Sequence, residues 1–228
     1  MKKGLLSILL CILSFGSVSV INAQCYGTVK LDTVAGAKGS NTFDIYTTYC
    51  DELILITYDG WQGPGSGPVK VDGNSATHLA TAFVYYYAVA ETYAYIAPSS
   101  GTHTIVCTEA PYNSPYYLNF AASFYASGTG YPLTIASLTY NTATISCTTG
   151  GSITDTISTF IPNSMIYGNF DNNNGQVGPF TDKWTGATWL GQLHEGNGID
   201  VSHADEPAPT AGVYTVTAGN NAGNGFGC

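Results

Sequence analysis

The sequence predicts an all-β protein, a β-sandwich or jelly-roll-like assembly, and three observations carry this prediction. Beyond residue 23 no apolar period of helical length occurs, and short runs of β-branched and aromatic residues take its place. Gly, Pro, Asn and Ser separate these runs. Charged residues make up only 9% of the chain, so Thr, Ser, Gly, Asn and Tyr dominate its polar positions. Many short strands separated by turns are typical of a sandwich.

The expected strands follow one another along the chain, and their patterns differ. TFDIYTTY alternates Phe43 and Ile45 against Asp44, as a strand with one buried face does. ELILITY is continuous and predicts a central strand covered on both faces. In order, the expected strands are 26–34, 42–49, 52–58, 80–90, 92–98, 101–109, 116–126, 133–140, 142–149, 154–161, 164–170, 187–193 and 212–219.

The N-terminal segment predicts export. Two lysines precede the apolar run LLSILLCILSFGSVSVI, which closes at Ala23. A basic start, an apolar middle and a small residue at the end are typical of a signal peptide, here 1–23, and an uncleaved membrane anchor is the alternative. We expect 24–228 to form the β region of a secreted or cell-surface protein, with no membrane insertion after cleavage.

The charge of the chain excludes nucleic acid as a partner. Six Lys and no Arg stand against fifteen Asp and Glu, a formal net charge of −9. Such a surface repels phosphate backbones and lacks the guanidinium fork that binds them. Sparse charge also permits packing against copies of the same chain. The expected partner is therefore a further copy, in a homopolymer, or a cell-surface glycan.

Cysteines beyond residue 23 predict disulfides. In an oxidising compartment the five of them can form two bridges and leave one thiol over. Cys107 and Cys147 both lie in strand-like runs and make a reasonable pair, and Cys25 and Cys50 flank the first expected strand. The connectivity does not follow from the sequence. Cys228 is expected to stay unpaired or to pair between chains.

Five tyrosines lie within residues 83–98, FVYYYAVAETYAYIAP. In strands, alternate tyrosines share one face of the sheet. Aromatic cross-strand pairs contribute roughly 0.2–1 kcal/mol each, so the first interpretation is a wall of the sheet. A carbohydrate platform is the alternative interpretation. Its ligand-contact candidates are Trp61, Tyr85, Tyr87, Tyr93 and Tyr95.

An internal echo predicts two related β-units. Residues 97–107 read APSSGTHTIVC and residues 208–218 read APTAGVYTVTA, an offset of 111 positions from 97 to 208. At about the same offset ELILITY matches NSMIYGNF, and each is followed by a turn region rich in Gly, Pro or Asn. We read two units, approximately 24–126 and 127–228.

The second unit is expected to lack its last strand. In the first unit GTHTIVC precedes the strand YYLNFAASFYA, whose counterpart would fall at about 227–237, past Cys228. An open sheet edge over an apolar core is an aggregation template. The N-terminal run with Val29 and Leu31 is expected to fill this gap, either in its own chain or in the next molecule of a head-to-tail polymer. A truncated sequence is the third interpretation.

The run HADEPAPTAGVYTVTA, residues 203–218, resembles a motif of secreted bacterial β-sandwich (adhesin-like) proteins. In these a similar run precedes a closing apolar strand. A looser similarity through DELILITYDG extends over much of 50–218. The resemblance implies a sandwich fold and an extracellular adhesive or structural role, and it carries over no catalytic residue. The sequence departs from the pattern because no closing strand follows Asn224.

Motifs for catalysis or metal binding are weak. His194-Glu195 lacks the second His of a zinc-protease helix, and no acid pair is spaced for sugar hydrolysis. The DNNNG turn loosely resembles a calcium loop, with Asp171, Asn173 and Asp182 as candidates, but an Asn/Gly turn is the plainer interpretation. We expect no enzyme, no catalytic residue and no cofactor other than calcium.

These patterns predict a non-catalytic extracellular protein with a structural or adhesive role. Self-assembly into a filament, joined by strand complementation from the N-terminal segment, is the leading hypothesis. A monomeric secreted carbohydrate-binding module is the alternative. The two differ in what the fold must provide, since a polymer needs an open strand edge and a binding module needs an exposed aromatic face.

Overall fold

The computed structural model describes residues 28–60, 67–84, 88–108, 117–127, 133, 152–173, 182–185, 188–195 and 199–220. These residues form strands joined by turns and contain no helix, so the all-β prediction is confirmed. The strands are β1 (Val29–Lys38), β2 (Thr42–Thr47), β3 (Glu52–Gly60), β4 (Val69–Val71), β5 (Asn74–Ser75), β6 (Thr77–Val84), β7 (Ala88–Ala97), β8 (Gly101–Cys107), β9 (Tyr117–Ala126), β10 (Ser152–Thr159), β11 (Ser164–Asn173), β12 (Asp182–Thr185), β13 (Thr188–Glu195), β14 (Ile199–Ala208) and β15 (Gly212–Asn220).

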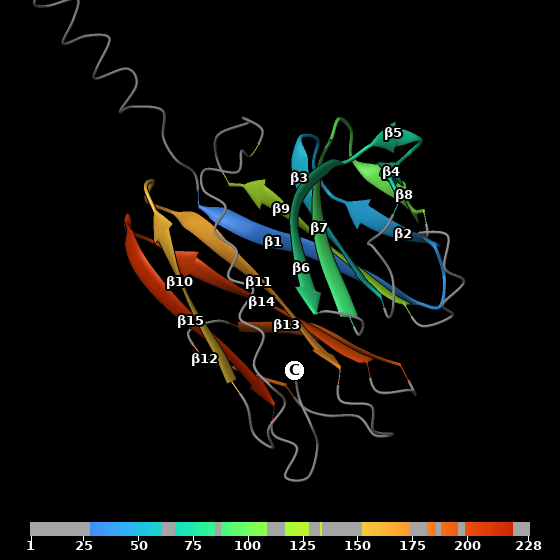
Figure 1. Cartoon of the computed structure of the whole chain (residues 1–228). Helices are drawn as coiled ribbons and strands as arrows, with labels where there is room; N and C mark the ends of the chain where they lie inside the picture. The colour runs from blue at the N-terminus through green and yellow to red at the C-terminus, as the bar shows by residue number, and fades with distance from the viewer. Residues whose placement is uncertain are drawn as a thin grey trace, which may run out of the picture.

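The strands form four antiparallel sheets (Figure 1). Sheet A has the order β1-β9-β3-β7-β6, and sheet B has the order β2-β8-β4-β5. Sheet C has the order β10-β15-β12, and sheet D has the order β11-β14-β13. Sheets A and B make up unit 1 (β1 to β9), and sheets C and D make up unit 2 (β10 to β15).

The two units repeat one plan of strand pairing. In unit 1, β2 pairs with β8 and β3 pairs with β7, whereas in unit 2, β10 pairs with β15 and β11 pairs with β14. The registers correspond, because Thr47 lies opposite Gly101 just as Thr159 lies opposite Gly212. Each residue on β8 therefore has a structural counterpart on β15.

The register irregularities repeat as well. In β6 the register shifts between His78 and Ala80, and in β13 it shifts between Trp189 and Gly191. β4 and β12 likewise occupy equivalent places, since β4 pairs with β8, the partner of β2, and β12 pairs with β15, the partner of β10. A bulge is a specific local feature, so its recurrence at the same place indicates two copies of one unit.

Both units turn the chain with a residue of positive φ. Asp51, before β3, and Asn163, before β11, each have a φ of 60°. Asp and Asn adopt this left-handed conformation more readily than most other residues with a side chain. The N–H of Asp51 donates to Ala97 O at 2.7 Å, and the N–H of Asn163 donates to Pro209 O at 3.3 Å. The same chemistry thus fixes this turn twice.

Sheets A and B enclose the core of unit 1. Ile54 and Ile56 of β3 and Ile105 of β8 are fully buried there, and Ile45 of β2 packs with them. Successive residues of a strand point to opposite faces, so Leu55, between Ile54 and Ile56, faces the other side of sheet A.

That other side of sheet A packs against sheet D. Phe120 and Phe124 of β9 are buried, and Met165 and Tyr167 of β11 pack against them. The rings of Phe120 and His203 of β14 are stacked with their centroids 3.7 Å apart. Sheet A is therefore covered on both faces, and the apolar strand β3 lies at its centre.

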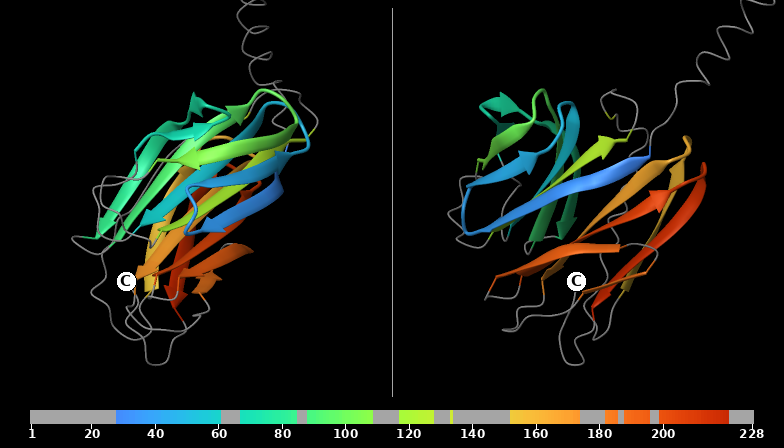
Figure 2. Two further views of the ribbon diagram at one scale, coloured as in Figure 1. Left: turned by 90° about the vertical axis from the view of Figure 1, so that its right-hand side faces the viewer. Right: turned by 180° about the vertical axis from the view of Figure 1, so that it is seen from behind.

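The sheets are layered in the order B, A, D, C (Figures 1 and 2). Ile166, Ala204 and Ala208 alternate with the residues of sheet D that face sheet A, and they are buried. Sheet C lies on that side. The two units are thus two sandwiches stacked through sheets A and D.

The structure contains strands that the sequence patterns do not predict. One of them is β14, whose sequence IDVSHADEPA is polar. A polar run is not expected to be buried, but His203 and Asp205 of β14 lie buried between two sheets. Pro207 is tolerated there because it lies past Asp205, the last residue of β14 that pairs with β13. The short strands β4, β5 and β12 are also absent from the expected strands, and the expected strand 80–90 covers the end of β6 and the beginning of β7 instead of one strand. The strands expected at 133–140 and 142–149 lie outside the described residues, apart from Leu133.

Candidate functional site

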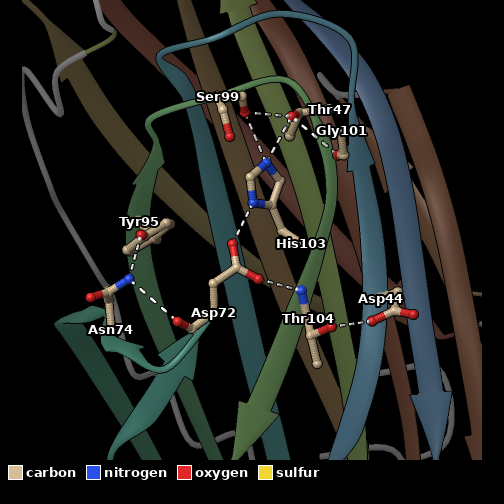
Figure 3. Close-up of polar contacts among 9 residues, drawn as sticks. All are labelled: Asp44, Thr47, Asp72, Asn74, Tyr95, Ser99, Gly101, His103 and Thr104. Atoms are coloured by element: carbon tan, nitrogen blue, oxygen red, sulfur yellow. Dashed lines mark hydrogen bonds and ion pairs between the residues drawn. The ribbon is translucent and has the colours of Figure 1, made fainter.

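A polar cluster surrounds His103 on β8 (Figure 3). Its Nδ1 lies 2.6 Å from Asp72 Oδ2, and its Nε2 lies 2.9 Å from Ser99 O and 3.0 Å from Thr47 Oγ1. The His103 side chain is buried, so these contacts are largely withdrawn from water. Each ring nitrogen thus lies within hydrogen-bonding distance of an oxygen from another segment of the chain.

Asp72 enters the cluster from the turn between β4 and β5. It has a φ of 51°, and Gly73 after it has a φ of 79°. Asp72 Oδ1 accepts a hydrogen bond from the N–H of Thr104 at 2.9 Å, and the Asp72 N–H donates to Thr104 O at 2.9 Å. Partial burial acts to raise the pKa of Asp72. Hydrogen bonds from His103 and Thr104, with the charge of His103, outweigh burial and hold this pKa below its ordinary value.

The order of groups in this cluster is that of a nucleophilic relay. Asp72, His103 and Thr47 place a carboxylate, an imidazole and a hydroxyl in sequence. A nucleophile must reach its substrate, but Thr47 is 0% exposed. Its hydroxyl also lies within hydrogen-bonding distance of the carbonyls of Ser99 and Gly101, at 3.3 and 3.5 Å. This geometry favours a brace between β2, β8 and the β4–β5 turn.

Unit 2 contains the same brace with a different side chain. Thr159 Oγ1 donates to Thr210 O at 3.3 Å and to Gly212 O at 3.4 Å, as Thr47 does in unit 1. Tyr214 occupies the position of His103, and its hydroxyl donates to Thr210 O at 2.7 Å. Because a tyrosine makes the bond in unit 2 that a histidine makes in unit 1, imidazole chemistry is not required for the brace.

His203 lies in a contrasting environment between sheets A and D. Its ring is fully buried and stacked on Phe120, and its Nδ1 lies 2.9 Å from Tyr167 Oη. Its Nε2 has no hydrogen-bond partner among the described residues. Burial lowers the pKa of His203 to about 3, so the ring is neutral at neutral pH. Burial also raises the pKa of Asp205, and the charge of Glu206 adds to this.

The tyrosines that the structure describes form part of the sandwich. Tyr93 is buried in the core between sheets A and B, and its hydroxyl donates to Glu91 Oε2 at 3.1 Å. Tyr95 is half-buried against the same core, and its Oη accepts a hydrogen bond from Asn74 Nδ2 at 3.4 Å. This placement favours the wall interpretation over an open platform. The other candidates, Trp61, Tyr85 and Tyr87, lie outside the described residues.

Two cysteines fall within the described residues. Cys50 is exposed in the turn between β2 and β3, and it forms no disulfide with another described residue. Cys107 is buried in the core of unit 1 at the end of β8. Cys25, Cys147 and Cys228 lie outside the described residues, so the expected pairings stay predictions.

The calcium candidates lie on strands of two different sheets. β11 extends through Asn173, so Asp171 and Asn173 belong to a strand paired with β14 and not to a turn, which corrects the expectation of a loop from residue 171. Asp182 begins β12 in sheet C. Among the described residues, no three His, Cys, Asp or Glu side chains are gathered in a way that could hold a metal ion.

The N-terminal strand completes unit 1. Val29 lies opposite Ala126 and Leu31 lies opposite Phe124, so β1 pairs antiparallel with β9 of its own chain. There Val29 and Leu31 pack against the phenylalanines of β9. β1 therefore does not occupy the edge of unit 2 in its own chain.

The edges of the equivalent strands β3 and β11 differ. β3 pairs on both sides, with β7 and with β9. Within the described part of the chain, β11 pairs with β14 alone. The edge of β11 that corresponds to the β9 side of β3 is therefore open among these residues.

Comparison with known proteins gives no relative. No family model matches the chain, and neither the curated proteins nor the solved structures contain a significant match. In the described ranges, no helix is both long and apolar enough to cross a membrane.

Proposed function

We propose that this chain is a non-catalytic extracellular protein, structural or adhesive, which self-associates by strand pairing at the edge of β11 with which no other described strand pairs. One observation supports this most directly. In unit 1 the equivalent edge, that of β3, carries an antiparallel strand, β9, along Leu53 to Gly60. A strand added to β11 would reproduce in unit 2 an arrangement that the same plan already adopts in unit 1.

The edge of β11 lacks the usual protection. Exposed edge strands commonly carry Lys or Pro, which discourage pairing with other chains. β11, SMIYGNFDNN, contains neither. β1, one of the two edge strands of sheet A, carries Lys30 and Lys38, and both are exposed. The lysines of β1 disfavour pairing of β1 with a second β1 but not with a strand that lacks lysine, so β11 is the edge better suited to accept a strand.

We infer that the donor is β1 of a second copy. The chain carries a net charge of −9, so copies repel one another unless the contact involves a basic element. β1 holds two of the six lysines, whereas β11 carries Asp171 and no lysine. Pairing β1 of one chain with β11 of the next joins two different edges, and such heterologous contacts produce head-to-tail polymers.

Charge reversal on β1 tests this joint. The double variant Lys30→Glu with Lys38→Glu is expected to shift the chain toward monomer in light scattering, because it brings negative charge to Asp171. Lys70→Glu, at an exposed lysine on β4, is the matched control and should leave the assembly intact. Wild-type chain that is monomeric at all concentrations contradicts the proposal, and a monomer that binds a glycan array favours the carbohydrate-binding alternative.

A competing peptide tests the strand pairing itself. A free peptide of residues 28–38 is expected to cap β11 and shorten the polymers. The same peptide with alternate backbone nitrogens methylated cannot donate ladder hydrogen bonds, and it should have no effect. Equal inhibition by the two peptides would show that backbone pairing is not the mode of association.

A further inference from the structure

Two carboxylates converge at the bulge in β1. The register of β1 on β9 passes from Leu31 opposite Phe124 to Val34 opposite Ala122, so Asp32 and Thr33 together face Ser123. On the other side of β9, Ser123 lies opposite Ile54 of β3, two residues after Glu52. The Asp32 carboxyl and the Ser123 hydroxyl both lie close enough to Glu52 to interact with its carboxylate.

Glu52 is buried without full compensation. The residue is 0% exposed, and its Oε1 accepts a hydrogen bond from the N–H of Tyr49 at 2.6 Å. Its Oε2 is buried and has no hydrogen-bond partner among the described residues. Burial raises the pKa of Glu52; the Tyr49 hydrogen bond opposes this, and the charge of Asp32 adds to it. A buried carboxyl beside a second carboxylate is neutralised either by a proton, which the raised pKa of Glu52 favours, or by a bound cation.

Unit 2 shows that the turn itself does not need a carboxylate. Glu52 opens β3 opposite Ala97, and its counterpart Ser164 opens β11 opposite Ala208. Ser164 Oγ donates to Ile161 O, three residues back, at 2.7 Å, and Glu52 accepts from Tyr49, also three residues back. A neutral serine thus ties the equivalent turn, so the turn alone does not explain the buried carboxyl group of Glu52.

The side chains around the two carboxylates carry oxygen atoms, and backbone N–H groups also donate to both carboxylates. Asp32 accepts hydrogen bonds from the N–H and the hydroxyl of Thr48, at 2.8 and 2.9 Å. Ser123 Oγ lies 3.0 Å from Thr33 Oγ1, which donates to Tyr46 O. Carboxylates, hydroxyls and a carbonyl are the ligands of a hard cation such as Ca²⁺, and two carboxylates balance its charge.

We propose that Asp32 and Glu52, together with the Ser123 hydroxyl, bind a divalent cation of the calcium type. The unpartnered Glu52 Oε2 would supply one ligand and Asp32 another. The bound ion would tie β1 to the turn that precedes β3 and stabilise β1 on its own chain. The site is separate from the Asp171, Asn173 and Asp182 pattern, and it does not depend on the self-association proposed above.

Terbium luminescence tests the site directly, because Tb³⁺ replaces Ca²⁺ and is sensitised by nearby tyrosine. Tyr49 is hydrogen-bonded to Glu52, and its ring lies 4.6 Å from the ring of Tyr125. The full chain, stripped with EDTA, is expected to give a luminescence signal with Tb³⁺ that Ca²⁺ displaces. Ca²⁺ should also raise the thermal midpoint of unfolding, because it binds the folded state alone. Absence of both effects would overturn the proposal.

Variants locate the ion. Glu52→Gln and Asp32→Asn are each expected to weaken Tb³⁺ binding about tenfold or more and to remove the Ca²⁺-dependent rise of the midpoint. Glu52→Ser introduces the residue that unit 2 has at the equivalent position, Ser164. This variant should therefore fold but should not bind the ion. Asp44→Asn, at an exposed carboxylate on β2, is the matched control and should bind as the wild type does. Undiminished binding by Glu52→Gln and Asp32→Asn would contradict the site.

Discussion

Unit 1 and unit 2 follow one plan of strand pairing but complete it differently. In unit 1 the brace at the end of β2 uses His103 and Asp72, whereas in unit 2 it uses Tyr214. In unit 1 Glu52 ties the turn before β3, and in unit 2 Ser164 does so without charge. At both positions a different side chain still ties the same local element. The brace keeps a bond to the equivalent carbonyl and the turn keeps a bond three residues back, so both positions have a structural role.

Two other differences between the units have no equivalent hydrogen bond in both, and they are the better guides to function. Unit 1 adds β9 beside β3 and β1 beside β9, while β11 has β14 as its one neighbour within the described residues. Unit 1 also carries the excess carboxylate of Glu52. Function is therefore best sought at the edge of β11 and at the bulge of β1, and not in the shared brace.

The largest effect is expected at the contact between the units. Phe120→Ala should lower the free energy of unfolding by about 3–5 kcal/mol, because it opens a cavity against His203. Urea denaturation measures this loss. Phe160, which is 73% exposed, gives the control variant Phe160→Ala, with an expected change of about 0.5 kcal/mol or less. Equal losses in the two variants would mean that sheets A and D do not share a core.

The next effect is the pH dependence of His203. The folded chain keeps this ring neutral down to about pH 3, whereas the unfolded chain protonates it below about pH 6.5. Protons therefore favour the unfolded state, and the free energy of unfolding should fall by up to about 1.4 kcal/mol per pH unit as the pH drops through this window.

The contribution of His203 must be separated from that of Asp205. The raised pKa of Asp205 acts in the opposite sense, because the folded chain takes up that proton before the unfolded chain does. Urea titrations of the wild type and of His203→Gln across this pH range isolate the histidine. We expect a shallower pH dependence in His203→Gln, and identical slopes would show that His203 titrates freely in the folded chain.

A smaller effect is expected from exchanging the two braces. His103→Ala should cost about 2–3 kcal/mol, since it leaves Asp72 and the Ser99 carbonyl without the ring. His103→Tyr copies unit 2 and should restore part of this stability through a hydrogen bond to Ser99 O. Thermal unfolding of the two variants compares them. A tyrosine no better than alanine would mean that the units are not equivalent at this position.

The smallest effect is expected at the threonines of the two braces. Thr159→Val should cost about 1 kcal/mol, because its hydroxyl bonds to Thr210 O and Gly212 O. Thr47→Val should cost more, because Thr47 is fully buried and also contacts His103. Chemical denaturation of both variants at neutral pH ranks them, and the reverse order would contradict the stronger brace in unit 1.

Local patterns explain which features the sequence could predict. Alternation in TFDIYTTY, the continuous run ELILITY and the echo of APSSGTHTIVC in APTAGVYTVTA are visible within short windows. The first pattern predicts a strand with one buried face, the second predicts a central strand, and the third predicts a repeated unit. The structure shows the corresponding pairs β2–β8 and β10–β15 in matching register.

Long-range contacts explain what the sequence could not predict. Asp72 and His103 meet across 31 positions, and Thr33 and Ser123 meet across 90. The alternation of polar and apolar residues within a strand gives no information on such distant contacts. β14 was missed because its buried His203 and Asp205 read as surface residues, and they are buried only because sheet A packs against sheet D.

Light scattering of the chain that begins at Gln24, eluted from a sizing column without reductant, tests self-association through β11 most directly. We predict a ladder of multiples of the chain mass that lengthens with concentration and collapses in the Lys30→Glu, Lys38→Glu variant. A single peak at the mass of one chain at every concentration would contradict the open edge of β11 as a joint between copies.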